Sequence, residues 1–104
     1  GLVLEAEREY REALQADAQS ALAHAGLASV RERDGEPSAA RQEAQASIGL
    51  KPNVPAYLVL ARLDLASNEV AAAAGDVDAA LKVDPANANA KGMRLAVEKR
   101  QNSQ

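Results

Sequence analysis

The sequence predicts an all-α fold built from stacked helix-turn-helix units, and three observations support this prediction. Alanine, the strongest helix former and a poor strand former, accounts for 25 of the 104 residues. Apolar residues recur with a helical period, whereas Val and Ile alternate with polar residues in no window. Two helical patterns stop at the proline dipeptides Lys51-Pro52 and Asp84-Pro85, and this spacing of about 33 residues is typical of helical repeat arrays. We refer to this spacing as one repeat. Residues 1–104 are enough for a single small domain.

A first helix is expected over residues 2–16. Its apolar face comprises Ala6, Tyr10, Ala13 and Leu14, which are spaced i, i+4, i+7, i+8. The pattern is predicted to end at Asp17-Ala18, which lies one repeat before Lys51-Pro52.

Two helix pairs are expected next, over residues 21–33 with 37–49 and over residues 54–66 with 69–82. The second helix of each pair repeats the apolar face of the first helix in the chain, with Ala40, Ala44, Ser47 and Ile48 in one and Ala73, Val77, Ala80 and Leu81 in the other. Gly1, Gly35 and Asn68 occupy matching positions before these helices. Because glycine and asparagine tolerate left-handed backbone, each is predicted to form a tight turn.

Each proline dipeptide explains why a helix ends and another begins. Pro85 has no backbone N–H and disfavours α geometry in the residue before it, so the preceding helix must end near Val83 or Asp84. Asn87 or Asn89 can then cap a last helix over residues 88–101, as Asn53 can after Pro52. This last helix has one apolar stripe and a charged remainder, which is typical of a capping helix at the end of a repeat array.

These units resemble the tetratricopeptide repeat (TPR). The matching positions are Tyr57, Leu60-Ala61, Ala73, Val77, Ala80-Leu81 and Asp84-Pro85 in one unit and His24, Leu27-Ala28, Ala40, Ala44, Ser47-Ile48 and Pro52 in the other. Arg31 and Asp64 replace the tyrosine of the family pattern. The resemblance implies a right-handed α-solenoid with a half repeat over 1–18, repeats over 21–53 and 54–87, and a capping helix over 88–101. Another α-solenoid or a plain helical bundle is the alternative.

The resemblance also implies a function, which is binding of an extended peptide or a partner helix on the concave face. The first helix of each pair lines that face, and the expected groove residues are Leu22, Ser29, Arg33, Leu58, Arg62 and Leu65. Leu58 and Leu65 lie off the main packing stripe, with Arg62 between them, so they could receive an apolar side chain and an acidic group. Alternatively, both leucines pack on the neighbouring repeat.

The sequence offers little for catalysis, so no enzyme activity, cofactor or metal site is expected. There is no cysteine, and the single histidine, His24, lies where the repeat pattern has an aromatic packing residue. The carboxylates of residues 5–12 read as a solvated helix face, since Glu7 can pair with Arg11 at i, i+4. A net charge of −3 argues against a nucleic-acid surface, and no apolar run approaches the roughly 20 residues that span a bilayer.

Another protein is therefore the expected partner, and the chain is expected to be a segment of a larger, alanine-rich bacterial protein because it begins at Gly1 within an amphipathic pattern. The compartment, cytoplasm or periplasm, stays open. The alternative function is structural self-assembly. Residues 1–20 carry five acids and two bases, whereas residues 88–104 carry four bases and one acid, so a homodimer through exposed terminal helices is a further expectation.

Overall fold

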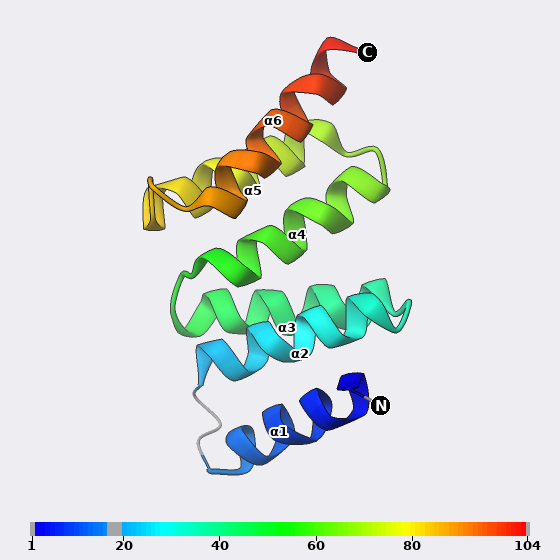
Figure 1. The fold of residues 1–104 in the computed structure, drawn as a ribbon, viewed down its shortest axis with the longest axis vertical. Coiled ribbons are helices and arrows are strands. Elements are labelled where there is room, and N and C mark those ends of the chain that lie inside the picture. The colour runs from blue at the N-terminus through cyan, green and yellow to red at the C-terminus, as the bar shows by residue number, and fades with distance from the viewer. Residues whose placement is uncertain (1, 17–19, 104) are drawn as a thin grey trace.

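The computed structural model describes residues 2–16 and 20–103, and every regular element in these ranges is a helix. The helices are α1 (Leu2–Ala16), α2 (Ala21–Arg33), α3 (Pro37–Leu50), α4 (Val54–Ala66), α5 (Val70–Val83) and α6 (Ala88–Asn102) (Figure 1). The predicted all-α class is confirmed. The predicted bounds are the same for α1, α2 and α4 and differ by a single position at one or both ends of the others. Gly1 and the predicted helix end at Asp17-Ala18 lie outside the described residues.

The asparagines that follow the two prolines cap helices as predicted. The side-chain oxygen of Asn53 accepts a hydrogen bond from the backbone N–H of Ala56 at 3.0 Å at the start of α4. Asn87, rather than Asn89, does the same for the N–H of Ala90 at 2.9 Å at the start of α6. These bonds satisfy donors that have no partner within the first helical turn, and so they fix where each helix begins.

The turn between α2 and α3 is built like the turn between α4 and α5. Gly35 and Asn68, which are one repeat apart, both have left-handed backbone, with φ of 75° and 59°. In each turn the N–H of the following residue donates to a carbonyl of the preceding helix, that of Arg31 at 2.9 Å or that of Asp64 at 2.7 Å. This is the hydrogen-bond pattern that closes a helix around a left-handed residue. The two helix pairs therefore share local structure as well as sequence spacing.

Successive helices pack against one another along the chain. Contacts are most extensive within the pairs α2–α3 and α4–α5. Helices α2, α4 and α6 also contact each other in order and form a row, while α1 packs on α2 and α6 packs on α5 and α4 (Figure 1). We call the surface formed by α2, α4 and α6 the first-helix row, because α2 and α4 are the first helices of their pairs.

Small residues allow the helices to approach closely. Ala28 on α2 and Ala61 on α4, at matching positions of the two pairs, are both fully buried. Gly26 has the same role where α2 meets α1, since a methyl group at this position would overlap the ring of Tyr10. A core of this kind buries little surface per residue and depends on close backbone packing. None of the helices in the described ranges combines the length and apolar character that crossing a bilayer requires.

Candidate partner-binding surface

The predicted groove residues of α2 lie at its two ends and its middle. Leu22, in the first turn, is 67% exposed. Ser29 is half-buried and Arg33, in the last turn, is exposed. Helix α2 therefore presents an apolar side chain, a hydroxyl-bearing residue and a cation along the first-helix row.

The predicted groove residues of α4 are less available than the sequence suggested. Leu58 is only 6% exposed and belongs to a core cluster with Val54, Ala80 and Ala90, which brings together α4, α5 and α6. Leu65 is half-buried against a second cluster that includes Val97 of α6. The expectation that Leu58 forms the floor of an open groove is thus corrected to a core position. The alternative prediction, that Leu58 packs on the neighbouring helices, agrees with this burial, to which α5 and α6 both contribute.

Arg62 already binds a carboxylate of the same chain. Its Nε donates to both carboxylate oxygens of Glu32, at 3.0 and 2.9 Å, and its Nη2 donates to Oε1 at 2.9 Å. This forked pair joins α4 to α2 across the first-helix row, with 40% of the Arg62 side chain exposed. Any acidic group of a partner must therefore compete with Glu32 for this guanidinium. The two residues lie on helices of different pairs, so their contact left no local signal in the sequence.

A second set of ion pairs joins each helix pair to the helix before it. The Glu7 carboxylate of α1 lies 2.9 Å from the Arg31 guanidinium of α2. The Asp64 carboxylate of α4 lies 2.7 Å from the Arg41 guanidinium of α3. Glu7 and Arg41 are one repeat apart, as are Arg31 and Asp64, so matching positions carry ion pairs of opposite polarity. Two of these residues, Arg31 and Asp64, are the departures from the family pattern seen in the sequence.

A pair of acids, the buried Asp64 and the half-buried Asp76, extends the Arg41–Asp64 contact into α5. Burial, followed by the hydrogen bond with Asp64 and the negative charge of that residue, raises the pKa of Asp76 to about 8. For Asp64, burial acts toward a higher pKa, but hydrogen bonds with Asp76 and Arg41 and the charge of Arg41 bring the pKa below its ordinary value. At neutral pH Asp76 is therefore protonated and donates to the Asp64 carboxylate. Nothing in the sequence marked Asp76.

Asp64 and one carboxyl oxygen of Asp76 lie inside the helix packing. Asp64 is 6% exposed, and the Oδ2 atom of Asp76 is buried without a hydrogen-bond partner in the part of the chain that the structure describes. Two carboxyl groups that share a proton can perform acid–base chemistry only where a substrate reaches them. With this burial, the pair supports a structural role between α3, α4 and α5.

His24 is part of the contact between α2 and α3. Its Nδ1 lies 2.7 Å from Oε2 of Glu43, with a fifth of the histidine side chain exposed. The sequence predicted a packing role for His24, and the structure adds a polar bond between the helices of one pair. Within residues 2–16 and 20–103, no group of three or more His, Cys, Asp or Glu side chains has an arrangement that could hold a metal ion.

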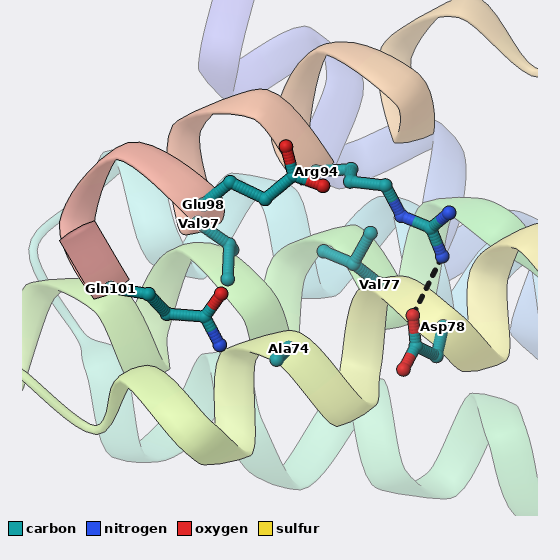
Figure 2. A pocket seen from close by; sticks show the side chains of 7 residues that line it. All are labelled: Ala74, Val77, Asp78, Arg94, Val97, Glu98 and Gln101. Carbon is teal, nitrogen blue, oxygen red and sulfur yellow. Dashed lines mark hydrogen bonds and ion pairs between the residues drawn. The ribbon is translucent and has the colours of Figure 1, made fainter.

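A small hollow lies between α5 and α6 (Figure 2). Its volume is about 220 Å³, and its lining residues are Ala74, Val77, Asp78, Arg94, Val97, Glu98 and Gln101. Figure 2 shows Arg94 reaching from α6 toward Asp78 of α5, and the two side chains form an ion pair at 2.7 Å. Glu98 and Gln101 follow along α6. Because acidic, basic and amide groups alternate around an apolar floor, this hollow favours no single ligand charge.

A second depression lies where the end of α5 meets the outer side of α6. It has a volume of about 360 Å³ and is lined by Leu81, Pro85, Lys91, Arg94 and Leu95. Leu95 is 68% exposed. This depression is more apolar than the hollow, and the charged side chains that line it are both cations.

Comparison with known proteins does not assign the chain to a family. No protein-family model matches the sequence, and a search of curated proteins finds no significant match. The functional argument therefore depends on the surfaces described above.

Proposed function

We propose that this chain is a non-catalytic interaction module of the TPR type, in which right-handed stacking of helix pairs forms a solenoid whose first-helix row binds a peptide or helix of another protein. The repeated spacing of helix ends in the sequence and the matching turns at Gly35 and Asn68 support a repeat architecture. Repeat arrays of this kind recognise their partners through an extended surface and do so without catalytic groups.

The observation that carries this proposal is the exposure of Leu22. Leu22 is 67% exposed on α2, a helix of the first-helix row, and in this proposal it contacts an apolar side chain of the partner. Arg33, exposed at the other end of α2, supplies a cation for an acidic group of the partner. The Glu32–Arg62 pair lies between α2 and α4 and offers a charged, hydrogen-bonding rim.

A peptide selection tests this proposal, with random displayed peptides as the probe and the intact chain as the immobilised target. Selected peptides should bind with their affinity dependent on Leu22, and Leu22→Asp should weaken binding by about tenfold or more. Fluorescence anisotropy of the labelled peptide measures the affinity, and circular dichroism checks that helicity is unchanged.

Leu50→Asp is the matched control. Leu50 is also a leucine with an exposed side chain, at 38%, but it lies at the end of α3 and outside the first-helix row. Binding to Leu50→Asp should equal binding to the unaltered chain. Peptides that bind Leu22→Asp and the unaltered chain equally would refute the first-helix row as the binding surface.

A further inference from the structure

Helix α1 has the character of the second helix of a pair. Glu7 on α1 and Arg41 on α3 are one repeat apart, and each forms an ion pair with the helix that follows it. Tyr10, which matches the buried Ala44 one repeat later, packs on α2 at Gly26. Helix α1 therefore approaches the next pair as α3 approaches α4.

Helix α6 begins like the first helix of a pair. The side chains of Ser20, Asn53 and Asn87 cap α2, α4 and α6 in the same way, each accepting from a backbone N–H in the first helical turn. Residues of the three helices can therefore be compared position by position, counted from each capping residue.

Positions that are buried in α2 and α4 are exposed to solvent in α6. Ala28 on α2 and Ala61 on α4 occupy the same place relative to their caps, and both are fully buried. Counted from its own cap, the corresponding residue of α6 is Leu95, which is 68% exposed. Lys91 and Arg94, next to this position on the helix surface, are exposed as well. Helix α6 thus presents to solvent a face that α2 and α4 bury.

The open positions of α6 form a basic strip, which we define as Lys91, Arg94 and Leu95. The strip borders the depression of about 360 Å³ at the end of α5. It presents one large apolar side chain, Leu95, beside two cations. The guanidinium of Arg94 bonds Asp78, but 46% of the side chain stays exposed. The exposed Glu98, one turn after Arg94, adds one carboxylate beside the strip.

The open side of α1 forms an acidic strip, which we define as Leu2, Glu5, Glu9 and Glu12. These residues are spaced at i, i+3, i+7 and i+10, so they share one helix face, and all are exposed. Leu2 is 84% exposed. Glu9 matches Glu43 one repeat later, the residue whose carboxylate bonds His24 across the α2–α3 contact. In the α2–α3 pair, Glu43 on the second helix, α3, therefore contacts the first helix, α2.

We propose that the acidic strip of α1 docks on the basic strip of α6 in a second copy of this chain, as α3 docks on α2. The acidic strip carries three carboxylates, whereas the basic strip carries two cations beside the carboxylate of Glu98, so the two strips differ in charge. Each strip includes an exposed leucine, and together they supply the two halves of a helix pair. In this arrangement Glu9 faces Lys91 of the other copy, because its match Glu43 bonds His24, which has the same place relative to its cap as Lys91. The contact is head-to-tail, so each copy keeps one strip open for a further copy. This assembly uses a surface distinct from the Leu22 region of the proposed peptide site.

Two complementary variants of the full chain test the proposal by sedimentation equilibrium. One carries Lys91→Glu and Leu95→Asp, which disable the basic strip. The other carries Glu5→Gln and Glu9→Gln, which remove the charge of the acidic strip without making α1 complementary to the altered α6 of the first variant. All four positions are exposed, so both variants should keep the helicity of the unaltered chain. The unaltered chain should increase in mean mass with concentration at low salt and lose this association as salt screens the charges.

Each variant alone should remain monomeric, and an equimolar mixture should form a dimer that grows no further, because each variant supplies the one strip that the other lacks. An unaltered chain that is monomeric at every concentration at low salt would overturn the proposal. Association of the first variant alone would instead show an α1–α1 contact, and association of the second alone would show an α6–α6 contact. Either result would also overturn the head-to-tail arrangement.

Discussion

At the scale of single residues, the charge state of Asp76 affects the stability of the fold. It contacts Asp64, its Oδ2 atom is buried, and its pKa is raised to about 8 by burial and by the neighbouring carboxylate. In the unfolded chain the same carboxyl titrates near its ordinary value of 3.8. The folded chain therefore holds a proton that the unfolded chain releases between these two pH values.

We expect the free energy of unfolding to fall as pH rises from about 4 to about 8. The contribution of Asp76 is fully present below its unfolded pKa and is lost as pH passes its folded pKa, with a slope of at most about 1.4 kcal/mol per pH unit. Asp64 acts in the opposite sense, because its lowered pKa reduces stability only as pH falls below its ordinary value. Urea denaturation at a series of pH values measures the slope.

Asp76→Asn supplies the control, because the amide can donate to Asp64 as the protonated acid does and has no proton to lose in this range. The variant should lose most of the slope and should be more stable than the unaltered chain above pH about 8. Equal slopes in the two proteins would show that Asp76 is ionised in the fold.

At the scale of helices, the sequence predicted where elements begin and end better than it predicted how they meet. Proline, asparagine and glycine act on their own neighbours, so Asn53, Gly35 and Asn68 could be assigned from local patterns, and the structure agrees. For the last helix the sequence left Asn87 and Asn89 open, and the cap is Asn87. Contacts between helices join residues far apart in sequence and depend on how each pair is placed. This is why the sequence left two positions for Leu58 open, in the groove or packed on the neighbouring repeat.

At the candidate site, too, contacts between helices could not be predicted from local sequence patterns. The sequence singled out Arg62 but not its partner Glu32, because no short motif links residues on α2 and α4. It noted Arg31 and Asp64 as departures from a pattern, yet their ion pairs with Glu7 and Arg41 emerged only once the helices were in place. The repeat spacing was the one signal that related these pairs. A position that changes from Arg to Asp between units indicates that its partner changes sign as well.

The burial of these interhelix ion pairs should determine their contribution to stability. Arg41→Ala leaves Asp64, which is 6% exposed, with a buried charge beside Asp76, and we expect it to lower the free energy of unfolding by about 2–3 kcal/mol. Arg94→Ala breaks an ion pair of the same 2.7 Å length whose two side chains are 46% and 61% exposed, and we expect a change of less than about 1 kcal/mol. Chemical denaturation at neutral pH measures both. Equal effects would mean that Asp64 is solvated well enough to need no partner.

At the scale of the whole molecule, stability should vary along the stack. The described residues form an elongated body of 44 × 26 × 20 Å in which each helix is held by its near neighbours. Helix α4 contacts α2, α3, α5 and α6, whereas α1, in the described part of the chain, contacts α2 alone. In an array held by neighbour contacts, a helix with one neighbour opens at a lower free energy than a helix with four.

Hydrogen exchange should therefore be fastest in the backbone amides of α1 and slowest in those of α4. Because the proposed assembly gives α1 a second neighbour, the protection of α1 should rise with protein concentration at low salt, while that of α4 should stay constant. The variant with Lys91→Glu and Leu95→Asp alters no residue of α1 but removes the surface on which α1 docks, so its α1 protection should be the same at every concentration. If α1 in the unaltered chain is as protected as α4 in dilute solution, α2 alone is sufficient to hold it and the stack behaves as one cooperative unit.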